Sequence, residues 1–509
     1  MSVTSPLPPP AHAGEPAQPL VVREPTVAII PTQYRPPDRG GYSGYAAPGY
    51  TPPPNYYQPV IPSQYPSQYP RPVYLPPPRR RRRGLAAAVV VALLLVLGAG
   101  GGAAAFVAAG PDGVARSLGG PGKAGTAPDA RDTAIIEVLN RRSKAVNSRD
   151  KTAFMADIDK TDAELTKRQE TVYENLIKLP FAEFSYKIGG GGGYDDSIPT
   201  ELKTKYGDQV RAPGVAIIHR IEGVDNDPVA APWVPIFALV SSQWRLVGEA
   251  KGKELPSGVG GQPWDAGPII VEKGEKVVGI FSANNRSRAG TLIRIADEAM
   301  DQVALVRPNQ WVGKVFMTAV RDRAVFDAYF GASPERVDQV AAIAVPHYDD
   351  VPDWNGTANY SATRVIFNPD EIDEDNDVLS ADMSHEFTHA AMAPVTTGWT
   401  PTWLVEGFAE YVSYKGAQID TNSLKRALDG VQTENLFAGE QFYDEPMNYI
   451  TAWLANRMIS ETYGETKLIQ LYERFQQTSN EEVVISQVLG VPRATLIKNW
   501  QDYVAKQKR

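Results

Sequence analysis

Two histidines four residues apart constrain this chain more than any other feature. His385 and His389 enclose Glu386 in the segment SHEFTHAAM, within a stretch from 375 to 392 that fits a helix. Side chains at i and i+4 lie on one helix face, so both imidazoles can bind one cation at about 2.1 Å. Glu386 stands beside that face and can reach a water on the cation. The spacing therefore predicts a metal site with a built-in base.

The small number of histidines makes a chance match improbable. The chain of 509 residues has five, and the alternative for the pair is two histidines on a helix surface. His219 lies in an apolar stretch that predicts a strand, and His347 lies in a loop-like segment, so we expect both to be structural. The chain has no cysteine, which excludes disulfides, thiolate metal ligands and a cysteine nucleophile.

A third protein ligand is required, because a catalytic zinc ion binds three protein groups and keeps one position for water. The segment PTWLVEGFAEYVSY predicts a second helix that opens at Pro401 and carries Glu406 and Glu410 on one face. If this helix packs antiparallel to the first, Glu406 can bind the metal. Glu410, one turn on, would then accept a hydrogen bond from an imidazole N–H. The alternative for Glu410 is a solvated helix face.

These residues carry a family resemblance. His385, Glu386, His389 and the segment WLVEGFAEY resemble the gluzincin zinc metallopeptidases, of the peptidase MA-like superfamily that includes aminopeptidase N and thermolysin. The resemblance implies Zn²⁺ as the cofactor, Glu406 as the third ligand and Glu386 as the general base for a metal-activated water. The pattern of the residues themselves, strand-like and helical in turn from 268 and nearly all helical after 377, predicts a sheet subdomain followed by a helical subdomain.

The chain departs from the aminopeptidases in ways that shape the expected activity. The Gly-x-Met-Glu-Asn motif that grips a free N-terminus is absent, which favours an endopeptidase. No histidine follows His389, so the donor for the reaction's oxyanion must be a Tyr or an Arg. The resemblance implies a downstream tyrosine; Tyr449 is the first candidate, with Tyr443 and Arg457 behind it. The alternative for Tyr449 is packing.

Two segments before the histidine helix also carry expectations. In gluzincins the edge strand at this place pairs with extended substrate, which assigns that role to TRVIFNP, residues 363–369. The acidic stretch NPDEIDEDNDV, residues 368–378, lacks the spacing of an EF-hand. We expect a solvated, capping loop there, with a Ca²⁺ site as the alternative.

An uncharged run divides the chain long before the metal site. Five arginines at 79–83 precede residues 84–110, which are long enough to cross about 30 Å of hydrocarbon. The arginines place the N-terminus in the cytoplasm and the C-terminal domains outside the cell, in a single-pass protein of the cell membrane. The alternatives are cleavage near AAFVAAG and a buried core helix.

The regions around this run differ in composition. Residues 1–78 are rich in Pro and Tyr without hydrophobic periodicity, which predicts a disordered tail, either a passive spacer or a site for a cytoplasmic partner. Two helices and then strands indicate a small α+β domain that is similar in pattern to the nuclear-transport-factor-like superfamily. The predicted segments are a tail at 1–78, a basic flank and transmembrane helix at 79–110, a linker at 111–130, the small domain at 131–253, a linker at 254–265 and the metallopeptidase-like domain at 266–509.

Charge narrows the classes of function. The first 83 residues hold nine arginines and three acids although the whole chain is −8, so the remainder is strongly acidic, which argues against nucleic-acid binding. We expect an α+β, membrane-anchored zinc peptidase that acts on a peptide or protein substrate. The alternative is a catalytically inactive binding or scaffold protein of the cell envelope that keeps the peptidase fold.

Overall fold

The computed structural model describes Pro72–Val73 and residues 130–509 apart from 253–254, 308–310, 331–339, 352–357, 432, 434–435, 437–441, 444 and 446. The predicted tail over 1–78, transmembrane helix within 79–110 and linker over 111–130 therefore lie outside the described residues, except for Pro72–Val73 and Ala130. Among the helices that are described, none is long and apolar enough to cross a bilayer.

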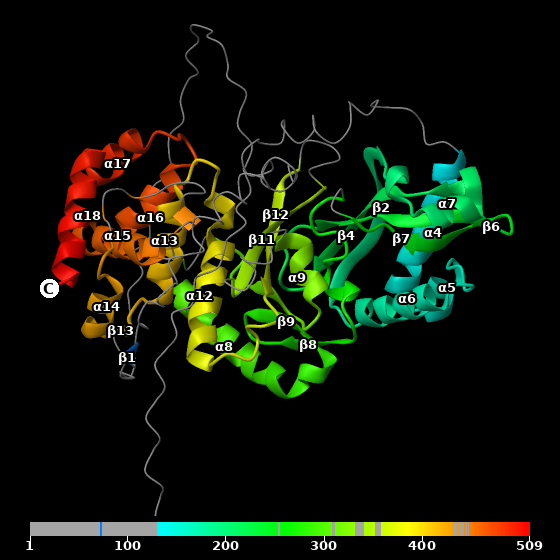
Figure 1. The fold of residues 1–509 in the computed structure, drawn as a ribbon, viewed down its shortest axis with the longest axis horizontal. Coiled ribbons are helices and arrows are strands. Elements are labelled where there is room, and N and C mark those ends of the chain that lie inside the picture. Colours follow the sequence, from blue (N-terminus) through cyan, green and yellow to red (C-terminus); the bar gives the residue numbers. More distant parts are fainter. Residues whose placement is uncertain are drawn as a thin grey trace, which may run out of the picture.

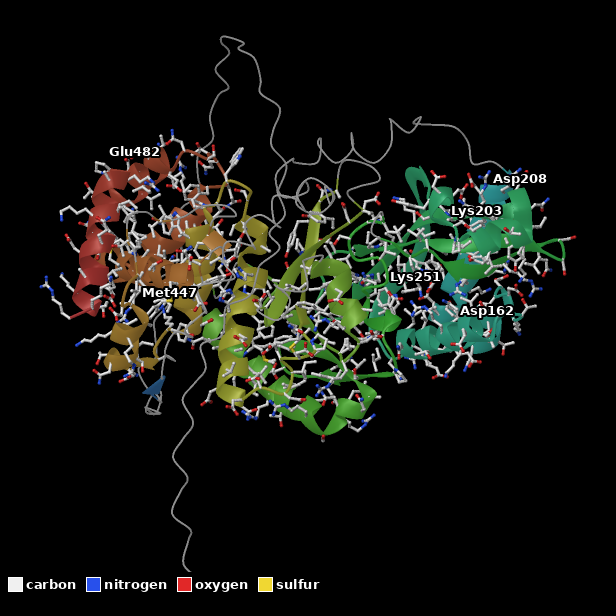
Figure 2. All side chains as sticks on the ribbon, in the orientation of Figure 1. Asp162, Lys203, Asp208, Lys251, Met447 and Glu482 are labelled. Atoms are coloured by element: carbon white, nitrogen blue, oxygen red, sulfur yellow. The ribbon has the colours of Figure 1, made fainter. Side chains whose placement is uncertain are left out.

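The described chain is α+β, as predicted. Figure 1 shows the small domain, a five-stranded sheet and the C-terminal helices following one another across the view in the order of the sequence. Charged side chains such as Asp162, Lys203 and Glu482 lie on the periphery of this arrangement (Figure 2). The two-residue strand β1 (Pro72–Val73) pairs in parallel with β13 (Gln418–Ile419).

Three helices open the small domain, where the sequence predicts two. They are α4 (Ala130–Asn147), α5 (Lys151–Ala156) and α6 (Ala163–Leu176). The extra break arises because two aspartates act as N-caps: Asp150 accepts a hydrogen bond from the Ala153 N–H, and Asp162 accepts one from the Leu165 N–H.

Six strands follow these helices in two three-stranded antiparallel sheets. One sheet has the order β2 (Phe181–Gly193), β4 (Pro213–Ile221), β5 (Val229–Trp233). The other has the order β3 (Val210–Arg211), β6 (Pro235–Val240), β7 (Gln243–Glu249). The short helix α7 (Thr200–Tyr206) lies between β2 and β3 in the sequence, and α4 packs against β2.

A further sheet, which follows the small domain, has five strands, with two antiparallel edges around a parallel centre. β10 (Val315–Ala319) lies between β9 (Val277–Ser282) and β12 (Tyr360–Phe367) and is parallel to both. The edge strands are β8 (Ile269–Lys273) and β11 (Ala342–Tyr348). The helix α8 (Arg286–Ala304) connects β9 to β10, and α9 (Arg323–Phe330) follows β10.

The prediction that residues 363–369 form an edge strand is wrong. This segment belongs largely to β12, which is hydrogen-bonded to β10 on one side and to β11 on the other. Its backbone groups are therefore already paired and cannot add a substrate strand. The local pattern of alternating residues identifies a strand but does not tell which strands lie beside it, because strand order depends on pairing between distant segments.

Nearly everything after residue 377 is helical, as the sequence predicts. The helices are α12 (Asn376–Met392), α13 (Thr402–Ser413), α14 (Thr421–Ala427), α15 (Met447–Tyr463), α16 (Glu465–Arg474), α17 (Glu481–Leu489) and α18 (Arg493–Gln507). α12 contacts both α8 and the strands β11 and β12, while α13 packs between α12 and α15. The histidine helix thus lies between the sheet and the remaining helices.

The small domain and the five-stranded sheet share one hydrophobic core. Ile135 and Phe184 from the small domain belong to the same buried cluster as Ile280 and Phe316 from the sheet. Trp264, from the segment 254–265 that the sequence predicts as a linker, is 2% exposed within that cluster. This segment therefore joins the two parts through buried contacts.

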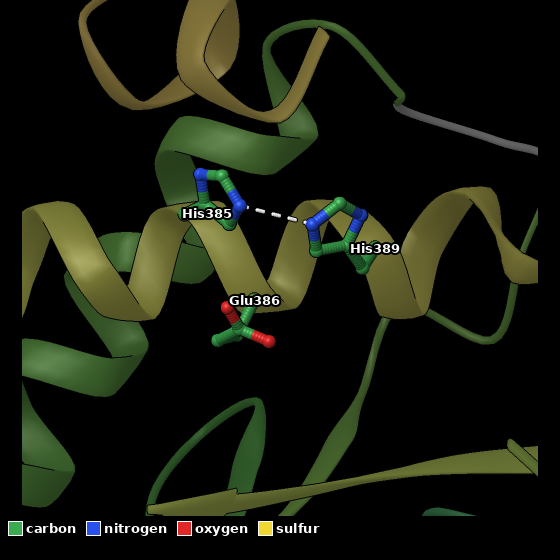
Figure 3. Close-up of side chains that lie close together, drawn as sticks. All are labelled: His385, Glu386 and His389. Carbon is green, nitrogen blue, oxygen red and sulfur yellow. Dashed lines mark hydrogen bonds between the residues drawn. The ribbon is translucent and has the colours of Figure 1, made fainter. Parts of the chain in front are cut away.

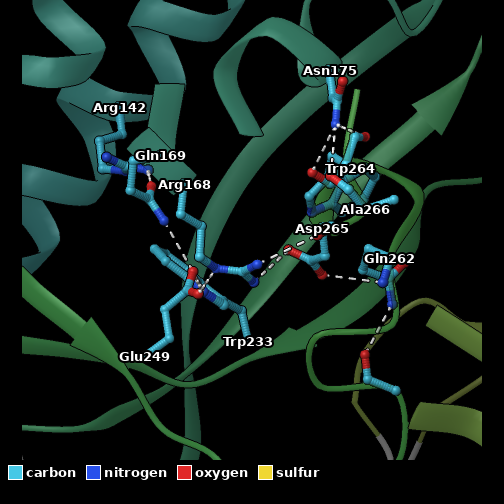
Figure 4. A network of polar contacts seen from close by, with 12 residues as sticks. Arg142, Arg168, Gln169, Asn175, Trp233, Glu249, Gln262, Trp264, Asp265 and Ala266 are labelled. Carbon is cyan, nitrogen blue, oxygen red and sulfur yellow. Dashed lines mark hydrogen bonds and ion pairs between the residues drawn. The ribbon is translucent and has the colours of Figure 1, made fainter. Parts of the chain in front are cut away.

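A buried asparagine fixes the path of the chain between the two parts. The Asn175 amide donates to the carbonyls of Trp264, Ala266 and Gly267, and its oxygen accepts from the Ile269 N–H (Figure 4). Asn175 is fully buried on α6. One side chain from the small domain thus holds the segment that leads into β8.

Candidate metal centre

The histidine helix α12 is buried along the stretch that carries the motif. Every residue from Met383 to Met392 is buried. The two hydroxyl groups next to the histidines bond within the helix, since the Ser384 hydroxyl donates to the Ser380 carbonyl and the Thr388 hydroxyl to the Ser384 carbonyl. The helix can therefore present two imidazoles to the protein interior without leaving these hydroxyls unpaired.

The two imidazoles converge on one point. The Nε2 atoms of His385 and His389 are 2.9 Å apart, and the two residues are 3% and 6% exposed. Figure 3 shows the two rings above the helix, with a nitrogen of each directed toward the other, and the Glu386 carboxylate below the helix in this view. Ligand atoms of these three residues lie within 4.8 Å of one another.

Glu406, on α13, completes this arrangement. Its Oε2 atom lies 3.3 Å from His385 Nε2 and 3.4 Å from His389 Nε2, and the residue is fully buried. A Cβ on the next residue, Gly407, would lie 2.5 Å from the Ala452 carbonyl oxygen on α15. A glycine is thus required for the close packing of α13 on α15 that holds the Glu406 carboxylate at the histidines.

The three atoms fit a zinc ion. A point equidistant from the two Nε2 atoms and Oε2, at separations of 2.9, 3.3 and 3.4 Å, lies about 1.9 Å from each. This is close to the bond lengths of about 2.0–2.1 Å that zinc makes to imidazole and carboxylate. Two nitrogens and one oxygen are also the donor set of a catalytic zinc site, which leaves a fourth position for water.

Glu410 lies behind His385, one turn after Glu406. Its Oε1 atom is 3.2 Å from His385 Nδ1. Burial alone would lower the pKa of His385, but the carboxylates of Glu406 and Glu410 together raise it well above its usual value. A divalent cation that binds Nε2 would displace the proton that this raised pKa favours there, and Glu410 Oε1 would then lie close to the Nδ1 proton that remains.

The remaining charges at the centre follow from burial and from these contacts. Burial lowers the pKa of His389, despite the neighbouring Glu406. Burial would raise the pKa of Glu406, but the histidines hold it at about 2, so this carboxylate is ionised at neutral pH. Glu386 is 0% exposed beside them. An ionised carboxylate suits a divalent cation, which also requires that both imidazoles be without a proton on Nε2.

The structure separates the three candidates for an oxyanion donor. The Tyr443 hydroxyl donates a 3.0 Å hydrogen bond to Glu406 Oε1, a contact that no local sequence pattern signals. Tyr449, on α15, is 5% exposed, and its ring centroid lies 6.3 Å from that of Tyr443. Burial, and then the charge of Glu406, raise the pKa of Tyr449 well above its usual value. Arg457 instead pairs with Glu461 at 2.7 Å.

The other two described histidines are buried away from this cluster. His219 lies in β4, and His347 lies in β11 rather than in the predicted loop. Burial, and then the charge of Arg364, lower the pKa of His219 to about 3 and that of His347 to about 4. The Nδ1 atom of each histidine lies within hydrogen-bonding distance of the backbone carbonyl two residues before it. Both side chains are packed as neutral groups.

The acidic stretch 368–378 is tied down by arginines. Arg321 pairs with Asp373, and Arg323 pairs with Asp370 at 2.6 Å. Arg288, on α8, donates to the carbonyls of Ile372 and Glu374. These contacts fit the predicted loop before α12 better than a Ca²⁺ site, which would need the same carboxylates.

Comparison with known proteins gives limited likeness. No family model and no curated protein matches the chain. Among solved structures, an M1 zinc metallopeptidase from Deinococcus radiodurans is 14% identical at a TM-score of 0.27, over 47% of this chain and 50% of that one. A mutant two-domain M1 zinc metallopeptidase bound to L-arginine is 14% identical at a TM-score of 0.28, over 47% and 52%. The chain thus spans about half the length of these structures.

Proposed function

We propose that this protein is a zinc-dependent peptidase, with His385, His389 and Glu406 as metal ligands and Glu386 as the general base. The observation that carries the proposal is the triangle formed by the two Nε2 atoms and Glu406 Oε2, with a second buried carboxylate beside it. A site for structure alone would close the fourth position with another ligand and would not need that second carboxylate.

Each group has a proposed role in the chemistry. Zinc, when bound, supplies a Lewis acid that acidifies a water molecule and polarises a carbonyl. Glu386 accepts the proton of that water and delivers it to the leaving amine. Tyr449 is the proposed donor to the oxyanion, and Glu410 keeps the imidazole of His385 in the tautomer that binds metal. The overall reaction is hydrolysis: one water molecule is consumed, the amide bond is broken, and no other co-reactant is needed.

The test separates metal binding from turnover. The full-length protein is purified, its zinc content is measured by elemental analysis, and cleavage of a mixed peptide library is followed by mass spectrometry. The variant Glu386→Gln should keep its zinc and lose cleavage by at least about 100-fold, as expected for a general base. Cleavage at internal bonds would support an endopeptidase. A zinc-free wild type would refute the proposal.

The alternative is a scaffold protein of the cell envelope that keeps the metal without turnover. Glu386 is the residue that argues against it, because a structural metal site does not use a base. Zinc bound by the wild type, with no cleavage of any peptide in the library and an unchanged partner-binding profile in Glu386→Gln, would favour the scaffold.

We further propose a single membrane anchor at residues 84–110, with the N-terminus in the cytoplasm and the domains outside. The support is the uncharged run after five arginines. Pairing of β1 with β13 would require the tail and the domain on the same side of a bilayer, so this orientation predicts that the pairing is absent in the anchored protein. Protease protection of the tail in sealed vesicles tests the orientation. The Pro/Tyr-rich tail could then bind a cytoplasmic partner.

A further inference from the structure

We propose that the Tyr443 hydroxyl is a positioning group that makes Glu406 bind the metal through one oxygen only. The inference rests on the proposed function for the presence of a metal. The sequence makes Tyr443 a second candidate for the oxyanion donor, and the positioning role proposed here is a different one.

The two oxygens of Glu406 have different surroundings. Oε1 accepts the 3.0 Å hydrogen bond from Tyr443, while Oε2 lies 3.3 and 3.4 Å from the Nε2 atoms of His385 and His389. Glu406 is fully buried, so water does not compete for either oxygen. One oxygen is thus assigned to the phenol and the other to the metal position.

The direction of the phenol is fixed by its neighbours. The ring of Phe442 meets the Tyr443 ring edge-on, at 5.5 Å between centroids and 80° between planes. Phe442 is 1% exposed and also packs against Tyr449 at 4.7 Å. The Asn448 amide, at the start of α15, donates to the Phe442 carbonyl at 2.8 Å. These contacts hold the segment before α15 in a position from which the Tyr443 hydroxyl reaches Glu406 on α13.

This hydrogen bond affects how many coordination positions of the metal the Glu406 carboxylate occupies. A carboxylate can bind a metal through one oxygen or through both, and binding through both would occupy the position that hydrolysis needs for water. Donation from Tyr443 draws electron density from Oε1 and favours binding through Oε2 alone. The phenol has one proton, so while it is given to Oε1 it is not available to an oxyanion. Tyr449 therefore remains the candidate for that task.

The experiment measures zinc affinity directly, on the full-length protein. Zinc dissociation constants are determined by competition with a chromophoric chelator for wild type and Tyr443→Phe. Loss of an outer partner of a metal ligand is expected to weaken binding by about 10–100-fold. The matched control is Tyr411→Phe on α13, the helix that carries Glu406. The Tyr411 hydroxyl bonds Ser460 at 2.9 Å and Glu465 at 2.6 Å and makes no recorded bond to Glu406. The zinc affinity of this variant should match wild type.

The outcomes separate this inference from the proposed function. If the wild type binds zinc and Tyr443→Phe binds it equally well, the positioning role is overturned; a fall in kcat alone would make Tyr443 the oxyanion donor. If the wild type does not bind zinc, the proposed function fails. A second measurement does not depend on the variant: X-ray absorption of the zinc-loaded wild type should show one carboxylate oxygen on the metal, and two would overturn the inference.

Discussion

Arg364 and Asp225 form a buried ion pair that joins the five-stranded sheet to the small domain. Arg364, on β12, donates from its two terminal nitrogens to the two carboxylate oxygens of Asp225 at 2.6 and 2.7 Å. The same carboxylate accepts a hydrogen bond from the Ile221 N–H at the end of β4. Burial would raise the pKa of Asp225, but Arg364 holds it below its usual value. The strand that precedes the histidine helix is thus tied to the small domain.

Removal of one partner should strongly destabilise the protein. Asp225→Ala leaves Arg364 buried without its counter-charge and removes an acceptor from the Ile221 N–H, so we expect a loss of about 3–5 kcal/mol in the free energy of unfolding. The control is Glu298→Ala, which breaks the exposed pair with Arg294 on α8 and should cost at most about 0.5 kcal/mol. Urea unfolding measures both. A loss below about 1 kcal/mol for Asp225→Ala would contradict the assigned role.

The metallopeptidase-like part should not fold without the small domain. Residues 266–509 alone would expose the face of the sheet that carries Ile280, Phe316 and Ile343, all buried in the shared core. We expect this fragment to lack a cooperative thermal transition and to aggregate, because it exposes a large apolar surface. A chain of residues 130–509 should instead unfold in one transition. A sharp transition for the shorter fragment, seen by calorimetry, would show that the domains are independent.

A buried carboxyl group at the junction gives a pH-dependent prediction. Burial, and then the charge of Glu249, raise the pKa of Asp265 to about 7, against the pull of Arg168 (Figure 4). Because the folded pKa lies above the unfolded value of about 3.9, this group's contribution to stability is complete below about pH 4 and is lost as the pH rises through about 7.

The variant Asp265→Asn should remove this dependence. The amide keeps an oxygen to accept the hydrogen bond from the Gln262 N–H but has no proton to lose. We therefore expect the variant to gain stability relative to wild type between about pH 5 and 8, by at most about 4 kcal/mol. Urea unfolding at each pH measures the difference, which also cancels the contributions of the buried histidines. A difference that stays constant across this range would contradict the prediction.

The limits of sequence reasoning can be seen in particular residues. The motif placed His385, His389 and Glu406 on two helices, and the structure brings their atoms together, because helical spacing is local information. The segment 254–265 reads as a linker from its glycines, yet Gly258 has φ +86° and a Cβ there would lie 2.5 Å from the Tyr329 ring. Here the glycine allows close packing against Tyr329 and does not mark a flexible backbone. This contact, like that of Tyr443 with Glu406, joins segments that are distant in the sequence. A local sequence pattern therefore cannot predict it.

The packing of α13 on α15 gives a prediction that links stability to metal binding. A Cβ in Gly407→Ala would collide with the backbone of Ala452, so α13 must shift and move the Glu406 carboxylate away from the histidines. We expect a loss of about 1–3 kcal/mol in the free energy of unfolding, together with weaker zinc binding by about 10-fold or more.

The control for this change is Gly290→Ala, on the exposed face of α8. A Cβ there meets nothing within 4 Å, so the substitution should stabilise the helix by about 0.5–1 kcal/mol and leave zinc binding unchanged. Urea unfolding and chelator competition measure both quantities for the two variants. If Gly407→Ala loses stability but keeps its zinc affinity, the carboxylate is held in place by something other than the contact between α13 and α15.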